Sequence, residues 1–395
     1  MHLMTPLPIS AYTVTSALGA GRDAHLKALR AGETGLRKIQ FDTNTLDCWL
    51  GEVIGFNTPL PAAFTKWECR NNRLAFYALQ QDAFMNGVTQ LKQRYGDDRV
   101  GVFIGTSTSG VQHTEVAYRE RNATTQALPD WFQHRYSQNI FSIADFVAHV
   151  LGFSGPTLAM STACSSSAKV FASARRAIAA GTCDAAIVGG VDSLCLTTLY
   201  GFNSLQLVSA DICRPADAAR SGISIGEAAG FAIVDPQAQA SIQLLGYGET
   251  SDAYHMSSPD PDGQGAVASM RAALKGANLA PENVDYINLH GTGTMANDSS
   301  EGRAIATVFG NETPCSSTKG WTGHTLGAAG IVEAAIAMLC IEHGFMPQSL
   351  NTRTKDPAIE AGILMEARHA PVRVVMSNSF GFGGSNCTLL LGSAA

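Results

Sequence analysis

The chain has 395 residues, 45% hydrophobic and 15% charged, which is enough to bury a large core as one α/β unit or two domains. Its formal net charge of −6 excludes the basic footprint of a nucleic-acid-binding protein. No apolar run reaches the roughly 18 residues of a membrane helix, so we expect no membrane insertion. Nine cysteines without a CxxC motif indicate reduced thiols in the cytoplasm and argue against a structural zinc site. Pro6 and Pro8 interrupt the start, which lacks a basic leader, so we expect no signal peptide.

Predicted strands and helices alternate along the chain. The apolar pattern predicts strands over 100–104, 156–160, 184–188, 284–289 and 372–376. It predicts helices over 165–181, 297–309 and 326–340. This alternation indicates mostly parallel sheets covered by helices, the α/β class. In such folds, functional residues gather at the carboxyl ends of strands.

Cys164 lies where the predicted buried strand over 156–160 meets the helix over 165–181. A thiol at this junction faces the positive end of the helix dipole, which favours the nucleophilic thiolate. The alternative is a buried structural cysteine.

A glycine-containing turn, His290-Gly-Thr-Gly-Thr294, follows the strand over 284–289. Its glycines let the backbone approach a ligand closely, and Thr292 and Thr294 offer two hydroxyls on one side. The alternative is a phosphate-binding loop, but the segment has neither the GxxxxGK[ST] nor the GxGxxG spacing.

Lys319 stands five residues before His324, which in turn precedes a helix rich in small residues. The helix dipole favours a neutral imidazole at this position, able to donate one N–H without carrying charge. Glu333 lies within the otherwise apolar helix and therefore needs a partner, for which Lys319 is the natural candidate. The alternative is a purely structural ion pair.

The segment Asn378-Ser-Phe-Gly-Phe-Gly-Gly-Ser-Asn386 predicts a turn whose backbone N–H groups form an oxyanion hole, with Phe382 as a gate. The alternative is a hairpin turn before a last strand over 387–391. A cysteine with a single basic histidine would suit a hydrolase, but neither histidine has an acidic orienter nearby in the sequence. Two neutral donors better suit an enolate oxygen on a thioester as carbon dioxide leaves.

Five segments in this order and spacing resemble the β-ketoacyl-acyl carrier protein synthases, condensing enzymes of the thiolase-like superfamily. They are residues 162–166, 186–190, 290–298, 319–330 and 378–386. The resemblance implies a five-layered αβαβα fold from two duplicated halves. Residues 1–240 would carry the nucleophile, and residues 241–395 the histidines and the gating loop. It implies decarboxylative condensation of a cysteine-bound acyl chain with malonyl-acyl carrier protein, an acyltransferase activity without metal or organic cofactor.

The resemblance also implies a role for each site residue. Cys164 takes the acyl chain, and its N–H with that of Phe382 forms the oxyanion hole. His290 and His324 bind the malonyl thioester oxygen, while Thr292 and Thr294 hold the phosphopantetheine arm. The supporting residues are Lys319 beside His324, Glu333 beside Lys319, and Asp298.

The expected partners are an acyl carrier protein and a second subunit, in a homodimer or in a heterodimer with another synthase-like chain. Lys66, Arg70 and Arg73, at roughly helical spacing, are the candidates for docking the acidic carrier. The alternative interpretation of these three is a solvated helix face.

Ala216, Ser221 and Ile223 depart from the family pattern, in which two of these positions carry phenylalanine and one carries an acid. The departures predict a divergent member of a fatty acid, polyketide or polyene pathway. They keep open a non-catalytic chain-length-factor subunit, which usually lacks the nucleophile. A thiolase or thioester hydrolase is the third possibility, with Cys387 as the second cysteine that a thiolase needs.

Overall fold

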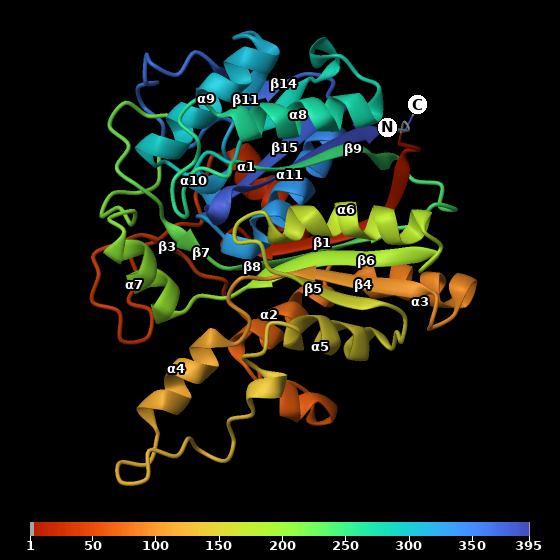
Figure 1. The fold of residues 1–395 in the computed structure, drawn as a ribbon, viewed down its shortest axis with the longest axis vertical. Helices are drawn as coiled ribbons and strands as arrows, with labels where there is room; N and C mark the ends of the chain where they lie inside the picture. The colour runs from red at the N-terminus through yellow and green to blue at the C-terminus, as the bar shows by residue number, and fades with distance from the viewer. Residues whose placement is uncertain (1–3, 395) are drawn as a thin grey trace.

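One mixed sheet runs through the whole molecule in the computed structural model, which describes residues 4–394 (Figure 1). Its strand order is β13-β11-β10-β15-β16-β9-β1-β8-β6-β4-β5, with β2 paired to β1. The strands are β1 (Leu7–Ser16), β2 (Gly19–Ala20), β4 (Val100–Gly105), β5 (Thr157–Met160), β6 (Ala185–Asp192), β8 (Ala228–Val234), β9 (Ile242–Ser251), β10 (Tyr286–Asn288), β11 (Pro314–Ser316), β13 (Gly362–Ile363), β15 (Val374–Gly381) and β16 (Ser385–Ser393). Two further short pairs are β3 (Leu50–Gly51) with β7 (Ile225–Gly226), and β12 (Phe345–Met346) with β14 (Arg368–His369).

The strand order repeats itself between the two halves of the chain. In the first half β4 lies parallel to both β5 and β6, and β6, β8 and β1 then pair antiparallel. In the second half β10 lies parallel to both β11 and β15, and β15, β16 and β9 pair antiparallel. The halves join where Leu7–Ile9 of β1 pairs with Ile242–Leu244 of β9. The duplicated fold is therefore confirmed, while the boundary at 240/241 stays a prediction.

Helices fill three layers around the two halves of the sheet (Figure 1). The central layer holds α6 and α11, which pack on each other and on strands of both halves. One outer layer packs beneath the first half and the other above the second. The helices are α1 (Arg22–Ala31), α2 (Arg70–Leu79), α3 (Phe84–Tyr95), α4 (Val111–Arg119), α5 (Ser142–Leu151), α6 (Ser166–Ala179), α7 (Leu196–Ser204), α8 (Gln264–Ala277), α9 (Met295–Phe309), α10 (Lys319–Thr322) and α11 (Ala329–His343), with 3-10 turns η1 (Ala62–Trp67), η2 (His134–Tyr136), η3 (Pro281–Asn283), η4 (Leu326–Ala328) and η5 (Phe382–Gly384).

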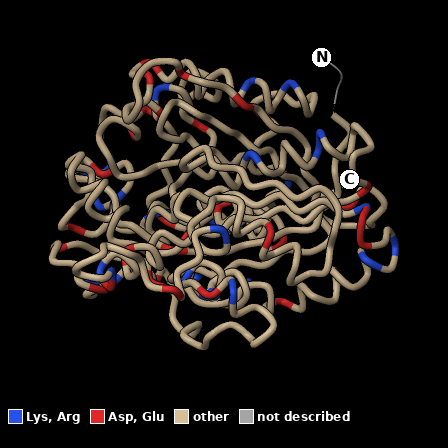
Figure 2. The backbone as a smooth tube through the Cα atoms, turned by 60° about the horizontal axis from the view of Figure 1, so that its bottom comes forward, with Lys and Arg blue, Asp and Glu red and all other residues tan. Residues whose placement is uncertain are grey.

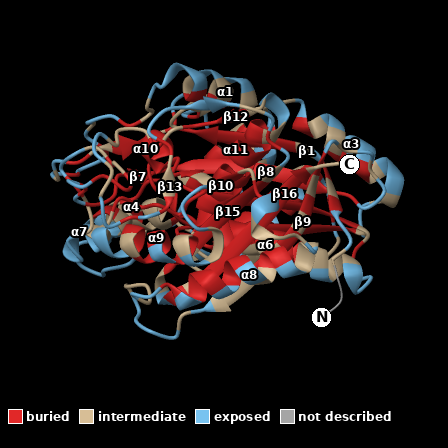
Figure 3. Ribbon diagram, turned by 90° about the horizontal axis from the view of Figure 1, so that it is seen from above, coloured by how far each residue is buried: buried red, intermediate tan, exposed pale blue. Residues whose placement is uncertain are grey.

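The helix α11 is buried on every side through its first twelve residues, whereas helices such as α1 and α8 expose one face (Figure 3). Small side chains allow this depth, since a Cβ added to Gly330 would lie 2.5 Å from the backbone nitrogen of Ala168 in α6. The segment Leu326–His343 is long and apolar enough to cross a membrane by composition, so the prediction of no such run was wrong. Because 83% of that segment is buried inside the fold, it is the core helix of the domain.

Two further sequence expectations need correction. The sheet is mixed rather than mostly parallel, because β8, β16, β1 and β9 add an antiparallel block to each parallel one. The strand β5 was predicted as buried, but it is the edge strand and leaves Leu158 38% exposed. The other expected strands and helices form at the predicted places, with β6 and β15 extended past their expected ends through glycine and small polar residues.

Candidate active site

Cys164 lies in the sharp turn between β5 and α6. The preceding Ala163 adopts a left-handed conformation with φ of 52°, which is costly for a residue with a Cβ and is typical of functional sites. The hydroxyl of Ser166 stabilises the turn, since it accepts the N–H of Thr162 at 2.9 Å and donates to the carbonyl of Ala163 at 2.6 Å. Cys164 is consequently held at the helix start, with only 5% of its surface exposed.

His290 follows β10, as expected, and a buried carboxylate fixes its backbone. Glu301 of α9 accepts the N–H of His290 at 2.8 Å and that of Gly291 at 2.7 Å. Burial raises the pKa of Glu301 to about 7, against the lowering effect of these two N–H groups. Glu301 was not among the predicted site residues, although an acid within the predicted helix over 297–309 was a signal of the same kind as Glu333.

Lys319 and Glu333 form the buried pair that the sequence predicted. Burial raises the pKa of Glu333 to about 7, and Lys319 acts in the lowering direction. The lysine ammonium also contacts His290, donating to its carbonyl oxygen and lying 3.3 Å from its Nδ1. The expectation that Lys319 supports His324 is therefore corrected, because its contacts are with His290.

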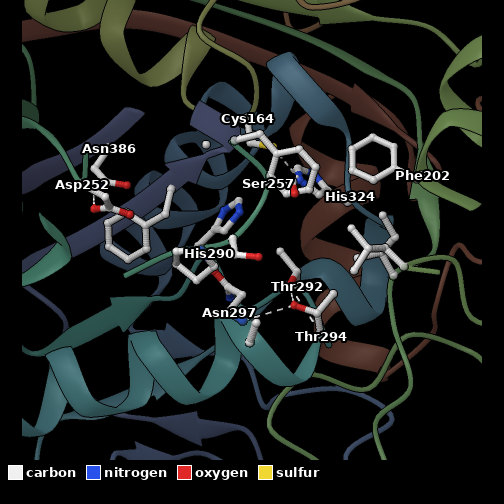
Figure 4. Close-up of a pocket in the computed structure, with 18 residues that line it drawn as sticks. Cys164, Phe202, Asp252, Ser257, His290, Thr292, Thr294, Asn297, His324 and Asn386 are labelled. Atoms are coloured by element: carbon white, nitrogen blue, oxygen red, sulfur yellow. Dashed lines mark hydrogen bonds between the residues drawn. The ribbon is translucent and has the colours of Figure 1, made fainter. Parts of the chain in front are cut away.

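His324 brings its Nε2 to within 3.0 Å of the Cys164 sulfur, and its ring lies edge-on to that of His290 with centroids 5.3 Å apart (Figure 4). Its Nδ1 accepts the backbone N–H of Leu326 at 3.2 Å. Leu326 has φ of 56°, a strained conformation for a bulky residue. The Leu326 N–H therefore orients the His324 ring, and the sequence could not identify this donor.

The thiol and both imidazoles each offer one possible ligand atom, all within 4.8 Å of one another. Metal-bound histidines normally donate their outer N–H to an acceptor. Here the outer nitrogens of His290 and His324 face donors, the Lys319 ammonium and the Leu326 N–H, so the ring protons lie on the inner nitrogens. Protonated inner nitrogens suit hydrogen-bond donation to a substrate oxygen and do not suit metal coordination.

Charge at the site follows from burial. Burial lowers the pKa of both His290 and His324 well below the usual value, and Lys319 lowers both further, so the imidazoles are uncharged. Burial raises the pKa of Cys164 to about 11, although Lys319 and the Phe382 N–H act the other way. The expectation of a resting thiolate is corrected, since desolvation outweighs the groups that favour it.

The turn η5, which the sequence analysis predicted as a gate, lies against Cys164. The Phe382 N–H acts to lower the pKa of the Cys164 thiol, and a Cβ on Gly381 would lie 3.3 Å from the Cys164 nitrogen. The Phe382 ring packs on Phe202 of α7 with centroids 5.4 Å apart. Sequence reasoning missed Phe202, since nothing in α7 marks it.

Two cavities meet at Cys164, Phe202 and Phe382. The first contains both histidines, Thr292, Thr294 and Ile223 (Figure 4). The second, about 360 Å³, extends away from the histidines and is lined by Ser107, Thr108, Ala163, Thr197, Thr198, Gly201, Leu205 and Leu326. Cys164 therefore lines two cavities at once.

Thr292 and Thr294 share a hydrogen bond of 2.9 Å and face the first cavity. Asp298 lies behind them and accepts the N–H of Gly293 at 3.2 Å and that of Ala216 at 2.8 Å, so it supports their loop. Ile223 is buried in the wall of this cavity. The Ser221 hydroxyl lies 2.6 Å from that of Ser209.

The three candidate docking residues, Lys66, Arg70 and Arg73, each contact another side chain of this protein. Arg70 pairs with Glu227 at 2.6 Å and Arg73 with Glu68 at 2.6 Å, while the Lys66 ammonium lies 4.1 Å from the Trp67 ring centroid. None of the three cations lines either cavity. Charges of both signs are interspersed over the fold (Figure 2).

Cys387 does not join the site. It lies fully buried within β16 and lines neither cavity. A thiolase mechanism with Cys387 as second cysteine therefore has no geometric basis.

Comparison with known proteins identifies relatives over nearly the whole chain. Residues 72–240 match the family model "Beta-ketoacyl synthase, N-terminal domain" and residues 242–353 match "Beta-ketoacyl synthase, C-terminal domain". The 3-oxoacyl-[acyl-carrier-protein] synthase 2 of Coxiella burnetii is 31% identical over 97% of both chains. The mitochondrial 3-oxoacyl-[acyl-carrier-protein] synthase of Arabidopsis thaliana is 36% identical over 75% of this chain and 69% of its own. A chain from the complex of a ketosynthase with its chain length factor, from Xenorhabdus doucetiae, superposes with a TM-score of 0.91 at 39% identity, covering 98% of both chains.

Proposed function

The chain belongs to the β-ketoacyl synthase family, and we propose that Cys164, His290, His324 and Lys319 carry out its condensation reaction. The enzyme is an acyltransferase that joins an acyl chain to a malonyl unit on acyl carrier protein and releases carbon dioxide. The observation that supports these residue roles best is the thiol 3.0 Å from the His324 Nε2 and within 4.8 Å of a His290 ring nitrogen, with both imidazoles uncharged and their outer nitrogens facing donors.

In the first step the Cys164 sulfur attacks the thioester of an acyl carrier protein. The new sulfur–carbon bond forms as the bond to the carrier thiol breaks, and the thiol proton of Cys164 leaves with the carrier thiol. The N–H groups of Cys164 and Phe382 stabilise the oxyanion of the tetrahedral intermediate. The acyl chain extends into the second cavity.

In the second step the malonyl thioester enters the first cavity, with Thr292 and Thr294 holding its phosphopantetheine arm. His290 and His324 donate their inner N–H groups to the thioester oxygen as carbon dioxide leaves and the enolate forms. Each such donor lowers the barrier by about 3 kcal/mol. Lys319 beside His290 adds positive charge, and Glu333 holds the lysine.

In the third step the enolate carbon attacks the carbonyl of acyl-Cys164. The sulfur–carbon bond breaks, the β-ketoacyl product stays on the carrier, and the cysteine takes up a proton. The reaction needs no cofactor besides the phosphopantetheine of the carrier.

The enzyme works with an acyl carrier protein and as a dimer. A second copy, or a second synthase-like chain such as the chain length factor of the Xenorhabdus complex, is the proposed other subunit. Intact Cys164 with both histidines supports the catalytic role over that of a chain length factor. We place the enzyme in the cytoplasm, in a fatty acid, polyketide or polyene pathway, with Lys66, Arg70 and Arg73 as the docking candidates that remain to be tested.

The decisive experiment incubates the protein with acyl- and malonyl-acyl carrier protein and weighs both proteins by mass spectrometry. We expect the acyl mass on Cys164 and a β-ketoacyl product, both lost in Cys164→Ala and both kept in Cys387→Ala. Condensation by Cys164→Ala at the wild-type rate would refute the role of the cysteine. Activity only after co-purification with a second synthase-like chain would show that the heterodimer is the working form.

A further inference from the structure

Asp192, at the end of β6, is a fully buried carboxylate that the reaction described above does not use. Its Oδ1 accepts the hydroxyl of Thr106 at 2.6 Å and both the N–H and hydroxyl of Thr108 at 2.9 Å. Its Oδ2 accepts hydrogen bonds from the hydroxyl of Ser107 at 2.5 Å and from the N–H of Gly327 at 2.6 Å. The Ser107 N–H is shared between the two carboxylate oxygens, at 2.9 Å from Oδ1 and 3.0 Å from Oδ2. No lysine or arginine within residues 4–394 pairs with Asp192, so neutral donors alone stabilise its charge.

The carboxylate joins two segments that both reach the catalytic cysteine. One is the loop after β4, whose Ser107 and Thr108 line the second cavity. The other is the turn after His324, where Leu326 lines the same cavity. The two segments are in direct contact, since a Cβ on Gly327 would lie 2.7 Å from the Asp192 Oδ2 and 2.7 Å from the Ser107 nitrogen.

The turn after His324 decides which ring nitrogen carries the proton. The Leu326 N–H donates to the His324 Nδ1 at 3.2 Å, and Leu326 itself adopts a left-handed conformation, which its own side chain disfavours. A strained conformation persists only when its surroundings hold it. The hydrogen bond of 2.6 Å from the adjacent Gly327 N–H to Asp192 is such a contact.

We propose that Asp192 is a positioning residue: it holds the turn at 325–327 so that His324 presents an N–H to the substrate, and it fixes the hydroxyl wall of the acyl cavity. The inference rests on the proposed function of His324 as a donor. Without Asp192, the His324 Nδ1 loses its donor and the ring can take the other tautomer. Its Nε2 would then accept the Cys164 proton, giving a thiolate with an imidazolium.

The test variant is Asp192→Asn, which keeps the shape but turns one acceptor into an NH2 group facing N–H donors. We expect malonyl decarboxylation and condensation to fall at least tenfold. We also expect the pH profile of Cys164 alkylation by iodoacetamide to move to lower pH. The matched control is Asp184→Asn, just before the opposite end of β6, where the carboxylate pairs with Arg99 at the surface; it should change neither.

A second variant separates position from charge. Around Cys164, the charges of Asp192 and Glu333 raise the thiol pKa and that of Lys319 lowers it, with His290 and His324 as the other titratable neighbours. Removing the Asp192 charge alone would therefore favour the thiolate. Gly327→Ala keeps that charge but displaces the turn, and Gly276→Ala in α8, with nothing nearer than 3.9 Å, is its control. A shifted alkylation profile in both Asp192→Asn and Gly327→Ala supports the proposal.

The proposal would be overturned if Asp192→Asn and Gly327→Ala both fold and both keep the wild-type rate of decarboxylation and the wild-type pH profile of Cys164 alkylation. If neither variant folds, a 15N-histidine spectrum of the wild-type protein decides, with the His324 signals assigned by their loss in His324→Ala. A proton on Nε2 of His324 supports the proposal, and a proton on Nδ1 refutes it. Alkylation and tautomer readouts do not require condensation, so they can fail independently of the proposed function.

Discussion

Replacing Lys319 by methionine removes the charge that neutralises Glu333 while keeping most of the buried volume. Both side chains are nearly inaccessible, at 1% and 4% exposure. Breaking a buried ion pair by removing one partner costs about 3–5 kcal/mol when the other group stays charged. A carboxyl can avoid part of this cost by taking up a proton, so the loss of stability depends on pH.

The sign follows from the raised pKa of Glu333, about 7 against an ordinary 4.5. A carboxyl whose pKa is raised on folding costs stability as pH rises from the unfolded pKa to the folded one. In the wild-type protein this cost stops growing near pH 7. In Lys319→Met the pKa of Glu333 rises further, so the variant loses about 1.4 kcal/mol for each additional pH unit. Between pH 7 and 8.5 the gap between the two proteins should widen by about 2 kcal/mol.

Urea unfolding at the two pH values measures this gap. The double variant Lys319→Met/Glu333→Gln should regain most of the stability and lose the extra pH dependence. It should not regain decarboxylation, which we expect to fall about 100-fold because the His290 Nδ1 has lost its donor. A gap that stays constant between the two pH values would refute the charge coupling of Lys319 with Glu333.

Three further predictions concern the thiol and the gate. Because the pKa of Cys164 is raised to about 11 from an ordinary 9.0, the free enzyme should react with iodoacetamide at pH 8 about 100-fold more slowly than an ordinary thiol, and a rate that levels off below pH 9 would contradict this. Gly381→Ala would bring a Cβ to 2.8 Å from the Thr162 carbonyl oxygen and 3.3 Å from the Cys164 nitrogen. Because this displaces the oxyanion hole, the steady-state rate of condensation should fall about 100-fold, and an unchanged rate would argue against the oxyanion hole. Phe202→Ala removes the ring packed against Phe382, an interaction of about 0.5–1.5 kcal/mol, so condensation should slow about 2- to 12-fold. Acylation of Cys164 at an unchanged rate, followed by mass spectrometry, would separate the gate from the nucleophile, and an equal fall in both steps would contradict that separation.

The sequence predicted a side-chain contact where a residue is energetically unfavourable among its neighbours in the chain. A glutamate in an apolar helix needs a cation, and Lys319 is indeed its partner. The strand and helix around Cys164 form at the places that the sequence predicted, although the strand lies at the edge of the sheet and is not buried. The family resemblance added the duplicated fold, which the repeated strand order confirms.

The sequence did not predict the contacts between segments that are far apart in the chain. Glu301 and Asp192 bind backbone N–H groups that any residue offers, so no side-chain pattern marks their partners. The lysine was assigned to the wrong histidine because sequence separation says nothing about which loop faces it. The thiol was assigned the wrong charge because the extent of its burial was unknown.

The amino-acid sequence by itself determined which reactive groups this protein has and the local turn that carries each of them, since periodicity and residue chemistry act over a few neighbours. Only the tertiary structure decided the protonation of the Cys164 thiol and which histidine Lys319 contacts. Both depend on desolvation and on donors brought together by strands from opposite halves of the chain, and these arise only when the two sheet halves close over α6 and α11.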